Sequence, residues 1–264
     1  MSNMTHAKIG LALGSGAARG LAHIGVLKVL ERNNIPIDYI SGASIGAVVG
    51  ALYAATRNVA EMEKVVTEAD WKLFLSLIDP TVVNGMIKGE KIKKFLRRFV
   101  GDMTFADLKI PLAVVATDLQ TGEPVILDKG DVVDAIMASS TVPLVFQPVK
   151  MNDHILVDGG LSHPVPTQIL RERGMKKVIA VNLDADFFTK KKVDLSPGAM
   201  AMQMITLMRY HLAEYDAALA DVVIAPEVGG IFGTRFNAGP PVIDMGEKAA
   251  QKVLPQIKKL AARN

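Results

Sequence analysis

The first 55 residues contain the same arrangement twice: a short apolar run, a turn rich in small residues, and a longer stretch with helical spacing of apolar residues. The first copy predicts a strand from Lys8 to Leu13 and a helix from Leu21 to Arg32. The second predicts a strand from Asp38 to Ala43 and a helix from Ile45 to Ala55. Repeated strand–turn–helix units are typical of a parallel sheet covered by helices. The chain is therefore predicted to be an α/β protein.

The alternation continues to about residue 225. Nearly continuous apolar runs, as in strands buried on both faces, predict further strands at 111–117, 177–183 and 222–225, with a hairpin turn at Thr121-Gly122 and a short strand at 155–157. Further helices are expected at 90–99, 132–139, 166–173, 197–219 and 246–262. Apart from this doubled strand–turn–helix arrangement, the sequence contains no stretch that repeats at a fixed period and no linker long enough to divide it. We therefore predict one domain over residues 1–264, with a motif-bearing core at about 8–230 and a C-terminal helix at 246–262.

The charge balance and the lack of cysteine exclude several functional classes. Thirty Lys and Arg face 27 Asp and Glu, which gives a net charge of +3, and 5% of the residues are aromatic. This is far from the basic stripe of a nucleic-acid-binding protein, so no nucleic-acid partner is expected. A chain with no cysteine has no disulfide, thiolate metal site or Cys nucleophile, and it fits a reducing compartment. We expect a cytoplasmic protein whose nucleophile, if it has one, is Ser, Thr, Asp or Lys.

The first turn has the composition of an anion-binding loop. It reads Gly14-Ser15-Gly16-Ala17-Ala18-Arg19-Gly20. Small residues let backbone N–H groups approach a ligand, and the helix that follows adds partial positive charge at its N-terminus. A purely structural turn explains the glycines equally well. Nucleotide binding is disfavoured because the third glycine comes one position late for a dinucleotide fingerprint and the Gly-Lys-Ser/Thr of a phosphate-binding loop is absent.

The second turn, Gly42-Ala43-Ser44-Ile45-Gly46, has the pattern of a nucleophile elbow. In such a turn, glycines two places before and after the serine let strand and helix pack closely and leave the hydroxyl exposed. The position of Ser44 between an expected strand and an expected helix favours a catalytic role. A helix N-cap role is the alternative, because serine is also favoured there.

A serine hydroxyl needs a base before it can act as a nucleophile. The chain has five histidines, at positions His6, His23, His154, His163 and His211. None lies in a motif that marks a catalytic histidine, and His23 is expected to be structural. Asp158 is the stronger candidate, because it ends an expected strand before Gly159 and Gly160, and active sites gather at strand ends in such sheets. An Asp-Gly turn without a catalytic role is the alternative.

Taken together, the glycine loop with Arg19, the elbow at Ser44 and the sequence Asp158-Gly159-Gly160 resemble the patatin-like phospholipase family in order and spacing. Other stretches similar to bacterial members of this family lie at Leu21–Leu27, Ala116–Leu119 and Ala138–Pro143, so the resemblance covers residues 8 to about 230. It implies a three-layer α/β/α sandwich with a mainly parallel central sheet. It also implies hydrolysis of phospholipid or lysophospholipid acyl esters by a Ser-Asp dyad that uses no histidine, cofactor or metal.

The resemblance assigns roles to individual residues. Ser44 is expected to be the nucleophile and Asp158 the base. The expected supporting glycines are Gly42, Gly46, Gly159 and Gly160, and the expected oxyanion loop comprises Gly14, Gly16, Ala17, Arg19 and Gly20. Ser15 and Ala17 depart from the family's run of glycines, and the amide of Ala17 can serve as an oxyanion donor if its φ is negative. We expect Arg19 to orient the loop by hydrogen bonds rather than to bind a phosphate head group.

Two segments bear on a membrane contact. The stretch 90–100 alternates apolar residues with Lys91, Lys93, Lys94, Arg97 and Arg98, as in a basic amphipathic helix that docks on an anionic bilayer; an ordinary solvated face is the more common reading. The methionines of 200–208 are expected to fill the core, with an acyl-chain pocket as the alternative. A regulatory or adaptor protein that retains the fold without turnover remains the alternative to an enzyme peripheral to the membrane. The oligomeric state and the lipid class stay open.

Overall fold

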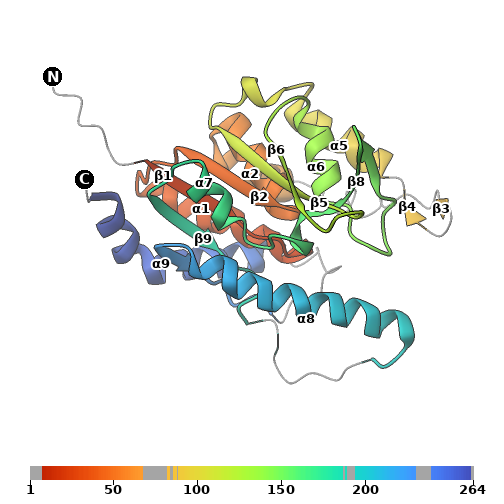
Figure 1. Cartoon of the computed structure of the whole chain (residues 1–264). Helices are drawn as coiled ribbons and strands as arrows, with labels where there is room; N and C mark the ends of the chain where they lie inside the picture. Colours follow the sequence, from red (N-terminus) through yellow and green to blue (C-terminus); the bar gives the residue numbers. More distant parts are fainter. Residues whose placement is uncertain are drawn as a thin grey trace.

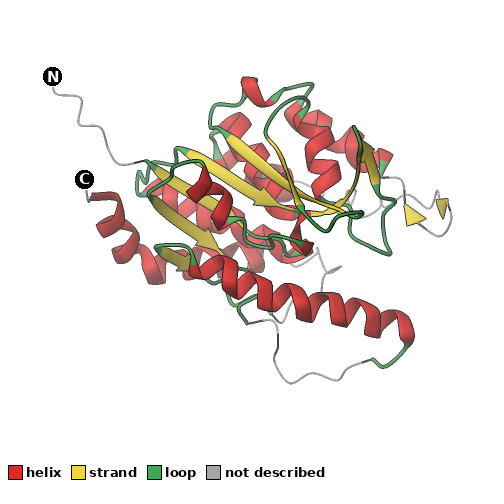
Figure 2. Cartoon of the chain, in the orientation of Figure 1, coloured by secondary structure: helices red, strands yellow, loops and turns green. Residues whose placement is uncertain are grey.

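An eight-stranded sheet forms the middle layer of the molecule (Figures 1 and 2). The computed structural model describes residues 8–67, 82–83, 86–87, 89–186, 188, 194–229 and 239–262. The strands follow the order β10-β9-β1-β2-β5-β8-β7, and β6 also pairs with β5. The parallel strands are β1 (Ile9–Leu13), β2 (Tyr39–Ala43), β5 (Leu112–Asp118), β9 (Lys177–Val181) and β10 (Val222–Ile224). The predicted mainly parallel sheet is confirmed.

Three antiparallel strands complete this sheet. They are β6 (Pro124–Leu127), β7 (Val149–Met151) and β8 (His154–Asp158). The hairpin between β5 and β6 turns at Gly122, whose φ of 77° is readily adopted only by glycine, so the hairpin predicted there is confirmed. A separate two-stranded sheet pairs β3 (Val82–Val83) with β4 (Met86–Ile87).

Helices cover both faces of the large sheet, which confirms the three-layer α/β/α architecture (Figure 2). The larger core cluster joins one face to side chains of α1 (Ala22–Arg32), α2 (Ile45–Thr56), α3 (Val59–Thr67), α5 (Glu90–Val100), α6 (Val132–Ser139) and α9 (Gly239–Ala262). A smaller cluster joins the other face to α7 (Thr167–Glu172) and the end of α8 (Pro197–Ala218). The helix α3 was not expected from the sequence.

The C-terminal helix packs against α1 at very short range. A Cβ atom at Gly25 would lie 1.9 Å from the carbonyl oxygen of Ile243, and one at Gly246 would lie 2.0 Å from that of Ala22. The two helices therefore meet backbone to backbone, which only glycine permits. The predicted start of this helix at residue 246 is wrong, because α9 already begins at Gly239, and the prolines that follow are tolerated in a first helical turn.

The outer part of α8 differs from the prediction for its methionines. Met200, Met204 and Met208 are exposed to 39%, 59% and 67%. They do not fill the core, and the prediction that they do is wrong. The periodicity of a long helix shows which residues share a face, but it does not show whether that face meets the protein.

Candidate active site

The pairings of β5 with β2 and β8 explain how Ser44 and Asp158, which are 114 positions apart in the sequence, come together. β2 and β8 occupy the same edge of β5, because β6 pairs with the opposite edge. Ala43 at the end of β2 is level with Val115, and Asp158 at the end of β8 is level with the next residue, Ala116. Since β8 runs antiparallel to β5, the carboxyl ends of β2 and β8 meet head to head. Ser44 follows Ala43 directly and therefore lies beside Asp158.

Ser44 lies in the sharp turn between β2 and α2. Its φ of 53° and ψ of −122° are unfavourable for a residue with a side chain, and such strain concentrates at functional sites. The glycines on both sides permit the turn: a Cβ at Gly46 would lie 2.0 Å from the carbonyl oxygen of Leu13, and one at Gly42 would lie 2.6 Å from that of Gly46. The Ser44 hydroxyl caps no amide of α2, so the N-cap alternative does not describe it.

The Ser44 hydroxyl donates to the carboxylate of Asp158, with 2.6 Å between Oγ and Oδ2. The other carboxylate oxygen, Oδ1, accepts the N–H of Gly160 at 2.8 Å. A Cβ at Gly159 would lie 1.9 Å from the carbonyl oxygen of Val115, so this glycine lets the chain turn tightly against β5. Asp158 is thus held at both oxygens, one by the backbone of its own turn and one by the serine.

One segment holds the backbones of both residues. Ser139 accepts the N–H of Ser44 with its hydroxyl at 2.8 Å, and the carbonyl of Thr141 accepts the N–H of Asp158 at 2.9 Å. Both come from the Ala138–Pro143 stretch that the sequence singled out. This segment therefore fixes the separation of the two chain ends.

Burial and charge act in opposite directions on Asp158. Its side chain is 7% exposed, and burial raises the pKa of its carboxyl above the usual value for Asp. Hydrogen bonds from Ser44 and Gly160 and the positive charge of Arg209 lower that pKa. The net shift is upward, so the carboxylate is a stronger base than a solvated one.

The glycine loop lies beside this pair, but its members have different roles. The N–H of Gly14 donates to the carbonyl of Val181 at 3.1 Å, so the inclusion of Gly14 among the oxyanion donors is wrong. The N–H groups of Gly16 and Ala17 donate to no other group in the described part of the chain. Gly20 serves packing, since a Cβ there would lie 2.1 Å from Cγ1 of Ile45.

Ala17 has a φ of 51°, so the negative φ that was set as the condition for an alanine donor is not present. Gly16 and Ala17 connect β1 to a short 3₁₀ helix (Ala17–Leu21), and the left-handed residue produces the sharp change of direction. A left-handed residue next to a helical one is the conformation in which successive N–H groups form an anion-binding nest. The substitution of glycine by alanine therefore costs strain but retains the amide donor.

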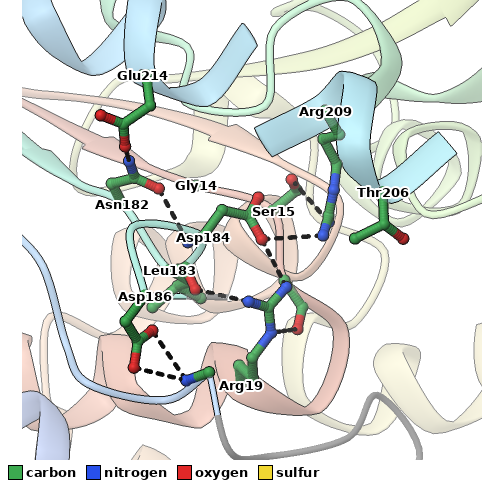
Figure 3. A network of polar contacts seen from close by, with 12 residues as sticks. Gly14, Ser15, Arg19, Asn182, Leu183, Asp184, Asp186, Thr206, Arg209 and Glu214 are labelled. Carbon is green, nitrogen blue, oxygen red and sulfur yellow. Dashed lines mark hydrogen bonds and ion pairs between the residues drawn. The ribbon is translucent and has the colours of Figure 1, made fainter. Parts of the chain in front are cut away.

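Arg19 lies beneath the loop, with its side chain 3% exposed (Figure 3). Its guanidinium donates to the carbonyls of Leu183 at 2.6 Å and Gly16 at 3.2 Å, and to Oδ1 of Asp184 at 2.7 Å. A group so enclosed orients the loop and offers no open face to a head group. These contacts are those of a side chain that orients the loop, which is the role expected for Arg19.

Arg209 is a site residue that the sequence analysis missed. It extends from α8 and donates to Oδ1 of Asp184 at 3.0 Å and to Oγ of Ser15 at 3.3 Å (Figure 3). Two guanidinium groups, those of Arg19 and Arg209, thus share one carboxylate oxygen. No motif surrounds Arg209, but one signal exists: between Leu195 and Ala213 it is the only Asp, Glu, Lys or Arg.

The four histidines in the described part of the chain have partners away from the dyad, while His6 lies outside it. The contacts are His23 Nε2 with Gly14 O at 2.8 Å, His154 Nδ1 with Asp118 Oδ2 at 2.7 Å, His163 Nδ1 with Asp216 Oδ1 at 3.1 Å, and His211 with the ring of Tyr210 at 5.3 Å. His23 is fully buried, and this burial lowers its pKa to about 4. No hydrogen bond links any of these four to Ser44 or Asp158.

The basic helix α5 turns part of its charge toward the protein. Lys93 pairs with Asp134 at 2.6 Å, and Arg97 pairs with Asp131 at 3.0 Å and with Asp102 at 2.7 Å. Asp131 and Asp134 belong to the start of α6, so these two cations join α5 to α6. Lys93 and Arg97, whose side chains are 35% and 30% exposed, are therefore partly engaged by acidic side chains of the protein itself.

The described residues contain neither a candidate metal site nor a helix that could span a membrane. Across residues 8–67, 89–186 and the other described ranges, no three His, Asp or Glu side chains are grouped so that they could hold a metal ion. Within the same ranges no helix has both the length and the apolar character needed to cross a membrane.

Three comparisons relate this chain to known proteins. The family model described as patatin-like phospholipase matches residues 11–171. An uncharacterized NTE family protein of Mycobacterium tuberculosis is 35% identical over 216 residues, which cover 81% of this chain and 59% of that protein. The human patatin-like phospholipase domain-containing protein 6 is 33% identical over 201 residues, or 73% of this chain and 14% of that protein. The chain thus spans less than two thirds of the length of these relatives.

Among solved structures, VipD from Legionella pneumophila has a TM-score of 0.67 at 14% identity, and the match covers 97% of this chain and 67% of that chain. At this identity the similarity concerns the fold alone. It extends beyond the residues of the family match to nearly the whole chain.

Proposed function

Because the chain belongs to the patatin-like phospholipase family, we propose that it is a serine hydrolase of lipid acyl esters, with phospholipids or lysophospholipids as substrates. The observation that carries this proposal is the 2.6 Å hydrogen bond from Ser44 Oγ to Asp158 Oδ2, formed in a strained elbow at a sheet edge. A serine paired with a base in this way is the arrangement of an activated nucleophile.

The reaction follows from the contacts of these two residues. Ser44 Oγ attacks the ester carbonyl carbon while Asp158 takes the hydroxyl proton, and the negative charge moves to the carbonyl oxygen. The free N–H groups of Gly16 and Ala17 stabilise that oxyanion. When the C–O bond to the alcohol breaks, Asp158 returns the proton to the leaving oxygen, which gives an acyl-enzyme. Water, deprotonated by the same carboxylate, then releases the fatty acid and restores Ser44.

The environment of Asp158 suits a base that must work near neutral pH. A solvated Asp has a pKa of about 4 and accepts a proton poorly at pH 7. Burial raises the pKa of Asp158 and so makes its carboxylate a stronger base, while the hydrogen bonds of Ser44 and Gly160 and the charge of Arg209 favour the ionised form. The dyad therefore needs no histidine to be chemically competent.

A regulatory or adaptor protein with the same fold is the alternative function. Such a protein has no need for a buried carboxylate or a strained serine, because both are costly for stability. The retention of this costly arrangement at Ser44 and Asp158 favours the enzyme.

The test is labelling with a serine-directed fluorophosphonate, followed by location of the adduct by mass spectrometry. We expect one adduct, on Ser44, and no labelling of the Ser44→Ala variant. Ser41→Ala is the matched control: this buried serine lies three residues earlier, and its hydroxyl donates to the carbonyl of Pro166, so labelling should persist. An unlabelled wild-type protein without activity on p-nitrophenyl esters would favour the adaptor.

A further inference from the structure

Large hydrophobic side chains that face solvent are concentrated in one part of the molecule. Of the eleven in the described part of the chain, nine lie between residues 188 and 219. They are Phe188, Leu195, Met200, Met204, Leu207, Met208, Leu212, Tyr215 and Leu219. Exposed apolar residues scattered singly need no explanation, but a contiguous group marks an interaction site.

Most of them form one face of α8. Met200, Met204, Leu207 and Met208 follow the spacing of i, i+4, i+7 and i+8, which places them on one side of a helix, and Leu212 continues the row. We call these five residues the α8 face. The helix extends along the outside of the molecule, past the helices and strands that pack around the sheet (Figure 1). Its inner end is anchored, since Ala213, Asp216 and Ala217 are its buried residues.

The outer half of α8 carries no charged side chain. From Pro197 to Met208 the sequence contains no Asp, Glu, Lys, Arg or His, and no residue of this stretch is buried. One of its two polar side chains is satisfied within the helix, because the hydroxyl of Thr206 donates to the carbonyl of Met202 at 2.8 Å. The stretch is therefore apolar almost all round, which is unfavourable in water and favourable at a hydrocarbon boundary.

We propose that the α8 face docks on a lipid surface and inserts its methionine and leucine side chains among the acyl chains. The charge pattern decides between possible occupants. A second copy of a helix, packed as a coiled coil, is usually selected by charged residues that flank the apolar row, and this stretch has none. An uncharged bilayer interface requires no such flanking charges. The proposal rests on the proposed function, because it names the surface from which that site would draw its substrate.

The position of the α8 face relative to the site is consistent with this role. Arg209, the residue directly after Met208, points inward and donates to Ser15 in the glycine loop at 3.3 Å. The helix thus presents its apolar side outward while a neighbouring residue contacts the site loop. A helix docked in this way lies on the surface rather than across it, as none of the described helices is suited to span a membrane.

The experiment is co-sedimentation with neutral phosphatidylcholine vesicles. The double variant Met204→Glu/Met208→Glu should lose affinity by about tenfold or more for each side chain, the scale of burying one such group in an apolar phase. Leu119→Glu is the matched control, because Leu119 is 58% exposed, like Met204 at 59%, but lies far from α8 in sequence and on a turn after β5. It should bind vesicles as the wild-type protein does. Activity on a soluble p-nitrophenyl ester should stay within about twofold in both variants.

Salt dependence separates the α8 face from the basic helix α5. Binding through an uncharged face should change little between low and high salt and should not require anionic lipid. Binding that needs anionic vesicles and disappears in salt would assign the contact to the basic side chains and overturn the proposal.

The remaining outcomes are also decisive. Unchanged vesicle binding by a folded double variant overturns the docking proposal, as does a wild-type protein that does not bind phosphatidylcholine vesicles. A wild-type dimer that the double substitution converts to a monomer, without vesicle binding, assigns the α8 face to a second copy. Vesicle binding that the double variant loses, in a protein that hydrolyses no ester, supports the docking and refutes the proposed function instead.

Discussion

Replacement of Asp158 by Asn tests the base without disturbing the geometry around it. The carboxylate is held at both oxygens: Oδ1 accepts the N–H of Gly160 at 2.8 Å, and Oδ2 accepts the Ser44 hydroxyl at 2.6 Å. An amide has one acceptor and one donor, and the Gly160 contact requires the acceptor. In Asp158→Asn the NH₂ group therefore faces Ser44 Oγ and donates to it, so the serine proton loses its acceptor.

Loss of a general base costs at least ~100-fold in kcat, which corresponds to about 2.7 kcal/mol of transition-state free energy at 1.36 kcal/mol per factor of ten. The stability should move the other way. Burial raises the pKa of Asp158, so above this raised pKa the ionised carboxyl lowers the stability of the folded state, and this cost is relieved as the pH falls toward the usual Asp range. The neutral amide removes the cost, and Asp158→Asn should melt at the same or a higher temperature than the wild type at pH 7 to 8.

The assay compares kcat and kcat/KM on a p-nitrophenyl ester with thermal melts of the same preparations. An inactive variant that melts at or above the wild-type temperature agrees with the reasoning. A loss smaller than about tenfold would show that Asp158 is not the base, because general-base catalysis contributes at least ~100-fold. A large loss accompanied by a markedly lower melting temperature would show that the carboxylate is structural.

Three further predictions concern neighbouring features. His163→Ala should leave kcat/KM on the same ester within about threefold. Its loss of stability should be largest at acid pH and should shrink as the pH rises, because the carboxylate of Asp216 raises the pKa of His163 and the charge attraction of the pair is lost above that pKa. A loss of activity equal to that of Asp158→Asn would require a triad. Arg209→Met removes a positive charge that lowers the pKa of Asp158, so the acidic limb of the pH profile of kcat/KM should move to higher pH. Arg209→Lys keeps the charge and should keep the wild-type profile. Identical profiles for the wild type and both variants would contradict this electrostatic role. Gly246→Ala would place a Cβ 2.0 Å from the carbonyl oxygen of Ala22. Although alanine has the better helix propensity, this variant should lower the free energy of unfolding by about 1–3 kcal/mol in a denaturant titration. An unchanged midpoint would refute the close contact.

The repeated strand–turn–helix pattern was enough to predict an α/β protein with a parallel sheet covered by helices, whereas the three-layer sandwich was predicted from the family resemblance. Apolar runs without alternation are specific for strands buried on both faces, and glycines at fixed distances from Ser44 are specific for a turn in which strand and helix nearly touch. These are local signals, so a single sequence contains them. The order of strands is not local. The sequence analysis did not predict that β2 and β8 share one edge of β5.

The features that the sequence did not predict depend on contacts between distant segments. Arg209 joins the site through Ser15 and Asp184, and no spacing along the chain reveals that contact. The charges of Arg97 were expected to face solvent, because a helical pattern shows that a face is basic but not that acidic residues of another helix meet it. The φ of Ala17 could not be predicted either, since alanine rarely adopts a left-handed conformation without tertiary support.

The end-to-end junction of β2 and β8 also has a consequence for how the protein loses activity on heating. β2 lies between β1 and β5 in the interior of the sheet, whereas β8 is held to β5 by three residue pairs and leads to β7 at the end of the strand order. Elements with few pairings open locally at lower free energy than the whole molecule unfolds. Opening of the β7–β8 hairpin would withdraw the base while the nucleophile stayed folded in its elbow. Thermal inactivation should therefore precede global melting. The rate at which Ser44 reacts with a fluorophosphonate would then measure how often the β7–β8 hairpin opens locally.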